Sequence, residues 1–310
     1  MGISLKPLHQ QVIVITGASS GIGLATAFAA ADQGAKVVVT ARSAHTLGEI
    51  VRDIEAWGGQ AIAVAADVAD RARLEHVART AVEHFGRIDT WVNDAGVSIY
   101  GRLDEVDDED RRRLFETNFW GVVYGSLVAL PYLKAQGGAL INIGSEVSEA
   151  AFPLQGMYAA SKHAVKGFTD SLRVELQADD APVSVTLIQP TAVDTPYPEH
   201  AANYLAQEPK LPTPQLEPEK VAAVILDAAV DPARDVKVGA MSVMNTMMSK
   251  IAPRLADRMA RIQMGRQQRD EPPQTREGTL YEPGEDGRTH GRGDENAADM
   301  QQALQSNVRS

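Results

Sequence analysis

The fold of this chain is indicated by one stretch near its N-terminus, Val12-Ile-Val-Ile-Thr-Gly-Ala-Ser-Ser-Gly-Ile-Gly23. Its first four residues are apolar and β-branched, which is typical of a buried parallel strand. The segment from Leu24 to Asp32 is rich in alanine and predicts a helix that ends at Gly34. A strand, a glycine-rich turn and a helix in this order are the context in which proteins bind a dinucleotide.

The glycines of this turn have separate expected roles. Gly17 permits a sharp turn, Gly21 lets backbone N–H groups approach a phosphate, and Gly23 lets the helix pack on the strand. A pyrophosphate would then meet the positive N-terminus of the helix. A tight turn without a ligand is the alternative interpretation. The stretch is not a P-loop, because no Gly-Lys-Ser/Thr follows.

The strand–helix alternation repeats along the chain and predicts an α/β fold, a doubly wound parallel sheet of Rossmann type with about seven strands and helices on both faces. Strands are expected near 12–16, 36–41, 61–65, 89–93, 139–143, 183–188 and 236–239. Helices are expected near 22–33, 46–57, 71–85, 108–134, 154–178 and 218–230. The chemistry should lie at the carboxyl ends of the strands, which Gly17, Asn93, Ser145 and Pro190 follow.

A second informative run is Tyr158-Ala-Ala-Ser-Lys162. Residues four apart share one face of a helix, so the Lys162 ammonium should lie near the Tyr158 hydroxyl. A phenol has a pKa near ~10, which is too high for a base at neutral pH, and a nearby ammonium lowers it. A shift of ~3 units needs ~4 kcal/mol. One lysine is not expected to supply all of it, so a cofactor charge or further hydrogen bonds should contribute.

Together these features resemble the classical short-chain dehydrogenase/reductase family over about residues 10 to 240. The resemblance rests on the glycine turn and on Asp67, Asn93-Asp-Ala-Gly96, Asn118, Ser145, Tyr158, Lys162 and Gln189-Pro190. It implies that Tyr158 is the general acid/base, and that Lys162 binds the nicotinamide ribose and lowers the pKa of Tyr158. It also implies that Ser145 hydrogen-bonds the substrate oxygen, and that Asn118 holds a water in a proton relay.

The same resemblance implies a set of cofactor-binding residues: Gly17, Ser19, Ser20, Gly21, Ile22, Gly23, Arg42, Asp67, Val68, Asn93, Ala95, Gly96, Tyr158, Lys162, Pro190, Val193 and Thr195. Two positions depart from the family pattern. Asp94 stands where the family usually has asparagine, and Thr191 stands where glycine usually follows the proline. Thr191 could change how the backbone approaches the nicotinamide amide.

The end of the second strand indicates the choice of cofactor. NAD-specific enzymes of this fold place a carboxylate there, whereas this chain has Ala41 followed by Arg42. An arginine offers a forked set of charged donors to a 2′-phosphate. We therefore expect NADP(H) to be preferred over NAD(H). Arg42 could instead point to solvent or stack on adenine, and Ser20 stands where many NADP-preferring relatives carry a basic residue.

Three regions are expected: a dinucleotide-binding and catalytic domain over 1–240, a Met-rich helical extension over 241–269, and an acidic, Gly/Pro-rich tail over 270–310 that is disordered or loosely docked. The proline-rich segment 191–218 suggests a lid, with a passive surface loop as the alternative. The apolar runs 97–101 and 152–154 would face it and suggest a substrate with a hydrophobic body.

Composition narrows the functional classes. The chain has 310 residues, 44% of them hydrophobic, and a net charge of −11, which argues against a nucleic-acid partner. It has no cysteine, and its histidines show no metal-ligand spacing, so no metal site is expected. No apolar run is long enough for a membrane span, and the N-terminus lacks a signal-peptide pattern. We expect a cytoplasmic enzyme, and the family resemblance implies a homodimer or homotetramer.

The sequence thus predicts an NADP(H)-dependent oxidoreductase that interconverts a small-molecule ketone and a secondary alcohol. Two alternatives remain at this stage. One is an extended-type sugar epimerase or dehydratase, although the glycine spacing fits the classical branch better. The other is a non-catalytic dinucleotide sensor, although such a protein would be expected to lose part of the set Asn118, Ser145, Tyr158 and Lys162.

Overall fold

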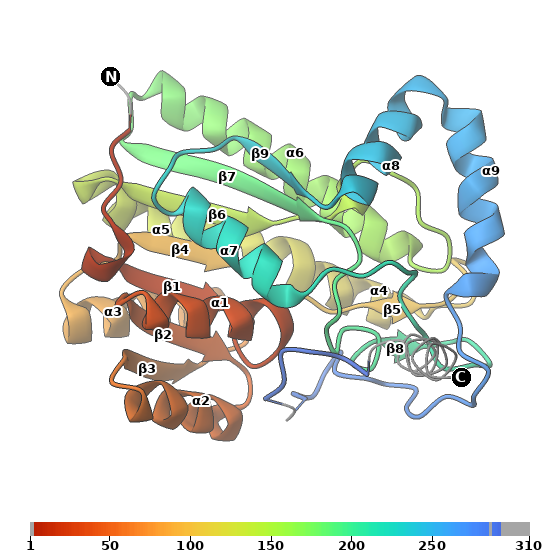
Figure 1. Ribbon diagram of the computed structural model, residues 1–310, viewed down its shortest axis with the longest axis horizontal. Coiled ribbons are helices and arrows are strands. Elements are labelled where there is room, and N and C mark those ends of the chain that lie inside the picture. Colours follow the sequence, from red (N-terminus) through yellow and green to blue (C-terminus); the bar gives the residue numbers. More distant parts are fainter. Residues whose placement is uncertain (1–2, 285–286, 293–310) are drawn as a thin grey trace, which may run out of the picture.

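The computed structural model describes residues 3–284 and 287–292. Its centre is a parallel sheet with the strand order β3-β2-β1-β4-β6-β7-β9 (Figure 1). These strands are β1 (Val12–Thr16), β2 (Lys36–Ala41), β3 (Gln60–Ala65), β4 (Thr90–Asn93), β6 (Gly138–Ile143), β7 (Val183–Pro190) and β9 (Asp235–Val238). The predicted doubly wound α/β sheet is confirmed, and each expected strand lies close to its predicted position.

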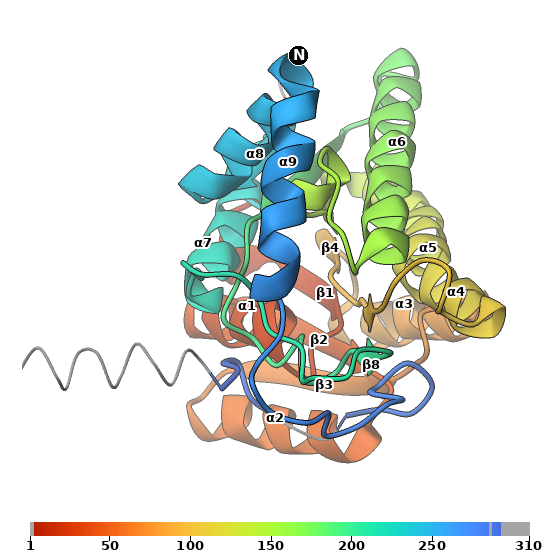
Figure 2. The same cartoon turned by 90° about the vertical axis from the view of Figure 1, so that its right-hand side faces the viewer.

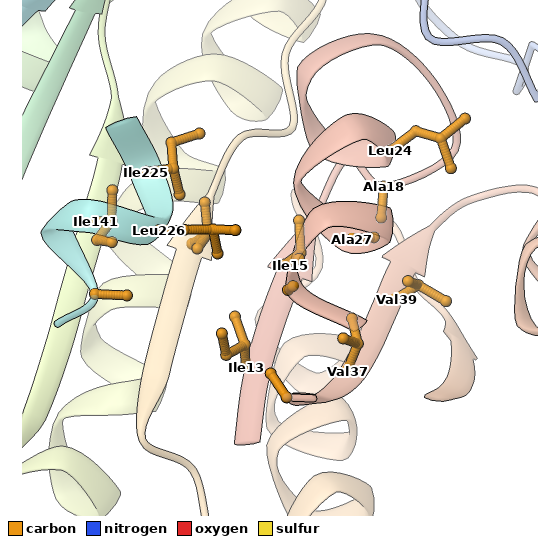
Figure 3. Packing of buried hydrophobic residues seen from close by; sticks show 14 of the residues in the cluster. Ile13, Ile15, Ala18, Leu24, Ala27, Val37, Val39, Ile141, Ile225 and Leu226 are labelled. Carbon is orange, nitrogen blue, oxygen red and sulfur yellow. The ribbon is translucent and has the colours of Figure 1, made fainter. Parts of the chain in front are cut away.

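Helices cover both faces of the sheet because every strand in its middle is apolar on both sides. One face carries α1 (Gly21–Asp32), α2 (Ala44–Ala56) and α7 (Pro218–Ala228), and the other carries α3 (Arg71–Phe85), α5 (Gly121–Gln136) and α6 (Gly156–Ala178). In β1, Ile13 and Ile15 point to the first face, while Val12 and Val14 point to the second. Figure 3 shows the first face, where β1 and β2 side chains meet α1 and α7.

The helix expected over 108–134 is interrupted. It consists of α4 (Asp108–Phe115), a π-helical turn η2 (Glu116–Trp120) and α5. A π-turn inserts one extra residue into the helical repeat, and such turns recur at functional sites. The predicted catalytic residue Asn118 lies inside this turn. This interruption was not predicted from the sequence.

The segment between β7 and α7 is largely irregular, as the proline-rich sequence predicts. It contains β8 (Ala202–Asn203), which pairs in parallel with β5 (Ile99–Tyr100) in a separate small sheet. Both strands are fully buried. The pairing therefore holds the middle of this segment against β5, which follows β4 near the carboxyl ends of the main strands.

The Met-rich residues form two helices, α8 (Ala240–Ile251) and α9 (Pro253–Gln263), followed by the short turn η4 (Met264–Arg266). Both helices stand beyond the carboxyl end of the sheet (Figures 1 and 2). Polar contacts attach α8, because the Ser242 hydroxyl donates to the Gln189 carbonyl at 2.8 Å and Lys250 pairs with Glu149. No helix in the described part of the chain is both long and apolar enough to cross a bilayer.

The described part of the predicted tail lies against the domain, which differs from the expectation of disorder or loose docking. Leu280 is 1% exposed and packs with Val97, Ile99 and Leu114. The Thr279 N–H donates to the His200 carbonyl at 2.8 Å. A single leucine in a polar segment gives no periodic pattern, so the sequence did not reveal this anchor. Residues 285–286 and 293–310 of the predicted tail lie outside the described residues.

We predict that Leu280→Ala lowers the free energy of unfolding by about 2–4 kcal/mol, because a buried leucine is replaced and a cavity remains. Thermal or denaturant unfolding measures the loss. Leu255→Ala is the matched control, since Leu255 is 49% exposed on α9. A tail that is disordered in solution would make both variants equally stable.

Candidate active site

A cleft with a volume of about 240 Å³ lies at the carboxyl ends of the parallel strands. Segments far apart in the sequence form its walls: the turn after β1, the ends of β2, β4, β6 and β7, and the first turns of α6. Most of the residues expected from the sequence line it: Gly17, Ser19, Ser20, Gly21, Ile22, Arg42, Asp67, Val68, Ala95, Gly96, Ser145, Tyr158, Lys162, Pro190, Val193 and Thr195.

The turn after β1 requires glycine at two positions. Gly17 has a φ of +75°, and a Cβ there would lie 2.7 Å from the Ala95 backbone. A Cβ at Gly23 would lie 2.4 Å from the Gly17 carbonyl oxygen. Such contacts cannot be relieved without moving backbone, so these glycines bring the start of α1 close to the chain after β4. The N-terminal end of α1 consequently faces the cleft.

Lys162 and Tyr158 project from the first turns of α6 into the cleft. The Lys162 Nζ donates to the Ile143 carbonyl at 2.8 Å, at the end of β6, and lies 5.6 Å from the centre of the Tyr158 ring. Ser145 follows β6, and its side chain lies close enough to the Tyr158 hydroxyl to lower the pKa of the phenol. The predicted triad of Ser145, Tyr158 and Lys162 is therefore brought together at one point of the cleft.

Burial raises the pKa of Tyr158 to about 12. Hydrogen bonds with Tyr197 and Ser145 lower it, whereas the carboxylates of Asp94 and Glu146 raise it. Burial also lowers the pKa of the Lys162 ammonium. The role that the family resemblance implies for Lys162, lowering the pKa of Tyr158, stays a prediction. The net effect of these surroundings is to favour the neutral phenol over the phenolate.

The two departures from the family pattern have structural consequences. Asp94 accepts a hydrogen bond from the Gly23 N–H and interacts with Lys162; burial raises the pKa of this carboxyl, and both partners lower it. The Thr191 hydroxyl donates to Glu146 Oε2 at 3.1 Å. Glu146 adjoins Ser145, so Thr191 helps to fix the loop that carries Ser145. Asp94 thus adds a carboxyl group beside the triad, and Thr191 holds the carboxyl group of Glu146 there.

Three predicted site residues do not line the cleft. Gly23 packs beneath the turn after β1. The Asn93 side chain lies inside the sheet, where its Nδ2 donates to Ser126 Oγ at 3.1 Å and to Asn142 Oδ1 at 2.8 Å. The Asn118 amide exchanges hydrogen bonds of 2.8 and 2.9 Å with the backbone of Val97. The Asn93 and Asn118 side chains therefore bond to residues of the scaffold around the cleft.

Several residues of the cleft were not assigned from the sequence. The Tyr197 ring lies 5.3 Å from the Tyr158 ring in an edge arrangement. Its hydroxyl donates to Gln155 Oε1 at 2.9 Å and lies within hydrogen-bonding distance of Ser98 Oγ at 2.7 Å. Its place in the proline-rich segment expected to form a lid was the only signal. Thr279, Pro283 and Gly284 of the C-terminal segment also line the cleft, and no sequence pattern indicated them.

Comparison with known proteins agrees with this geometry. Residues 11–204 match the family described as short chain dehydrogenase. The chain belongs to the short-chain dehydrogenase family. It is therefore an oxidoreductase that acts on hydroxyl or keto groups and binds a nicotinamide dinucleotide.

Its relatives include the uncharacterized oxidoreductase YxnA of Bacillus subtilis, which is 46% identical over 287 residues. That match covers 91% of this chain and 81% of the relative, so it extends well beyond the last strand into the C-terminal extension. The 11-beta-hydroxysteroid dehydrogenase 1A of Arabidopsis thaliana is 34% identical over 190 residues, which are 61% of this chain and 54% of the relative.

Two solved short-chain dehydrogenase structures show the same fold. A short chain dehydrogenase/reductase from Burkholderia phymatum in complex with NAD has a TM-score of 0.73, 26% identity, and coverage of 81% of this chain and 96% of its own. An alcohol dehydrogenase from Thermococcus sibiricus complexed with 5-hydroxy-NADP has a TM-score of 0.65, 28% identity, and coverage of 74% and 94%.

We predict that Gly23→Ala weakens dinucleotide binding by roughly 10-fold or more, because the added Cβ would meet the Gly17 carbonyl at 2.4 Å and distort the turn. Fluorescence titration with a reduced cofactor measures this. Gly48→Ala in α2 is the control, because a Cβ there meets nothing within 4 Å. Unchanged affinity in Gly23→Ala would show that the turn does not position the dinucleotide.

Proposed function

We propose that this protein is an NADP(H)-dependent oxidoreductase that interconverts a ketone and a secondary alcohol, with Tyr158 as the general acid/base. The observation that carries the proposal is the convergence of Ser145, Tyr158 and Lys162 on one cleft with the glycine turn after β1. A sensor that only binds the dinucleotide would have no use for a half-buried tyrosine beside a serine and a lysine at that position.

The proposed roles follow from the contacts. Ser145 donates a hydrogen bond to the substrate oxygen and orients the carbonyl beside Tyr158. In reduction, the Tyr158 hydroxyl gives its proton to the oxygen as that oxygen becomes an alkoxide; in oxidation, the phenolate takes the proton back. The bound nicotinamide supplies or accepts the hydride. Lys162, fixed on the Ile143 carbonyl, keeps a positive charge beside the phenolate that forms.

The walls of the cleft support a substrate with a hydrophobic body. Beside the triad the lining is largely apolar, with Val97, Phe152, Leu211 and Pro212 contributing from three different segments. The polar groups near them, Tyr197 and Gln155, already bond each other. A ketone or alcohol with an apolar body could bury it here without leaving many of its polar groups unpaired.

The preference for NADP(H) is supported by the end of β2. Arg42 lines the cleft there, and Ala41 stands where a carboxylate would repel a 2′-phosphate. Asp67, at the neighbouring strand end, is paired with Arg113 at 2.5 Å, so its charge is partly compensated. The two solved relatives were determined with NAD and with 5-hydroxy-NADP, so the fold alone does not decide the choice.

We predict that Tyr158→Phe lowers turnover by about 10²–10⁴-fold while cofactor affinity changes little, because only the proton-transferring hydroxyl is lost. Steady-state rates on a panel of ketones and alcohols, with cofactor titrations beside them, test this. Tyr132→Phe, on α5 away from the cleft, should behave as the unmodified protein. Turnover by Tyr158→Phe at the unmodified rate would reject the assignment.

A second prediction concerns pH. The Asp94 carboxylate raises the pKa of Tyr158, so Asp94→Asn should lower it. Alcohol oxidation requires the phenolate, and the rise of its rate with pH should therefore move to lower pH in this variant. Asp104→Asn is the control, because the Asp104 side chain is 85% exposed. A pH profile that stays in place, or moves to higher pH, would contradict the proposed role of this carboxylate.

A further inference from the structure

The C-terminal segment after α9 returns along the molecule toward the start of α1 (Figure 1). We call residues 276–284 and 287–292 of it the strap. The strap is held at several points: Leu280 is buried, the Tyr281 hydroxyl donates to Asp110 Oδ1 at 2.8 Å, and His290 Nε2 lies 3.0 Å from Glu217 Oε2. These anchors lie outside the catalytic triad.

Four backbone carbonyls of the strap accept hydrogen bonds from the Arg42 guanidinium. Nη1 of Arg42 donates to the carbonyls of Leu280 at 3.3 Å and Tyr281 at 2.9 Å. Nη2 donates to the carbonyls of Thr279 at 2.5 Å and Glu282 at 3.2 Å. A guanidinium has five N–H donors, and four of them belong to the two Nη atoms. A forked bond from both Nη atoms to a 2′-phosphate therefore requires some of these carbonyls to leave.

A further carbonyl of the strap accepts a hydrogen bond from a backbone N–H at the end of the glycine-rich turn after β1. The Gly21 N–H, at the first residue of α1, donates to the Arg288 carbonyl at 2.9 Å. This helix end is where the pyrophosphate of a dinucleotide is expected to be bound. Arg42 and Gly21 belong to different elements, so the strap reaches two separate donors that the cofactor phosphates would use. Between them, Thr279, Pro283 and Gly284 form part of the cleft wall.

We propose that the strap competes with the cofactor for these phosphate donors and thereby sets cofactor selectivity. This inference rests on the proposed NADP(H)-dependent function. Phosphate oxygens form stronger, charge-assisted bonds with a guanidinium than neutral carbonyls do, so saturating NADPH displaces the strap from Arg42. NADH has no 2′-phosphate and gains nothing from a free Arg42. The strap consequently reduces affinity for NADPH more than affinity for NADH.

One substitution can detach the strap without touching either donor. Gly278 has a φ of +55°, and a Cβ there would lie 2.4 Å from the His200 carbonyl oxygen and 2.5 Å from the Ala201 backbone. Gly278→Val should therefore push the strap off its seat. Gly265→Val is the matched control, because a Cβ at Gly265 meets nothing within 4 Å. A chain that ends at Thr275 removes the strap altogether.

The first test is a set of dissociation constants for NADPH and NADH. They are measured on the unmodified protein, Gly278→Val and the chain ending at Thr275, each with Arg42 and with Arg42→Gln. Circular dichroism confirms that each variant folds. We expect detachment to tighten NADPH binding by roughly 5-fold or more, with a smaller gain for NADH. The excess gain should vanish with Arg42→Gln. Unchanged or weaker NADPH binding, or the same excess gain without Arg42, would overturn the proposal.

The second test is hydrogen exchange at the Thr279 amide, which is bonded to the His200 carbonyl in the strap's seat. Saturating NADPH should speed its exchange, since the strap leaves. Slower exchange would indicate a lid that closes over the cofactor, and unchanged exchange would indicate that the strap stays in place. Either result would overturn competition. The two proposals fail separately. Tighter binding of NADH than NADPH by the chain ending at Thr275, in which no strap competes, rejects the proposed cofactor preference. The change in NADPH affinity that Gly278→Val causes tests the strap.

Discussion

The organisation of the site depends on one buried cation. Lys162 is 4% exposed, and its ammonium is bonded to the Ile143 carbonyl at the end of β6 and faces the Asp94 carboxyl after β4. A buried ammonium is costly unless it is paired and hydrogen-bonded. These two partners therefore fix the start of α6 against two strand ends. Tyr158, one helical turn before Lys162, is placed beside Ser145 as a consequence.

The same burial that orders the triad opposes the charge that catalysis needs. It raises the pKa of Tyr158 and lowers that of Lys162, while Asp94 and Glu146 add negative charge nearby. The protein's side chains thus favour the phenol over the phenolate. We infer that the positive charge of the oxidised nicotinamide is what shifts this balance. Proton transfer would then depend on whether the cofactor is bound. The strap competes with the cofactor for its phosphate donors and would therefore affect this step as well.

The sequence predicted features that depend on local pattern. The sheet follows from short β-branched runs, the turn after β1 from its glycines, and the meeting of Tyr158 with Lys162 from helical spacing. Features that depend on backbone acceptors far along the chain were not predictable. The partners of Arg42 are main-chain carbonyls nearly 240 residues away, and any residue type supplies a carbonyl. The resemblance implies that Asn93 binds the cofactor and that Asn118 holds a water, and both roles stay predictions. The bonds of their side chains to Asn142 and to the Val97 backbone could not be predicted from the sequence.

The proposed acid/base role of Tyr158 requires that its hydroxyl ionises within reach of the operating pH when the cofactor is bound. The most direct measurement is the ultraviolet absorbance of the phenolate, taken as the difference between the unmodified protein and Tyr158→Phe and followed against pH with and without saturating NADP⁺. Without the cofactor we expect a transition above the ordinary range of a tyrosine, because burial raises the pKa of Tyr158, and with NADP⁺ we expect a transition at lower pH. A transition at the same pH under both conditions would contradict the account.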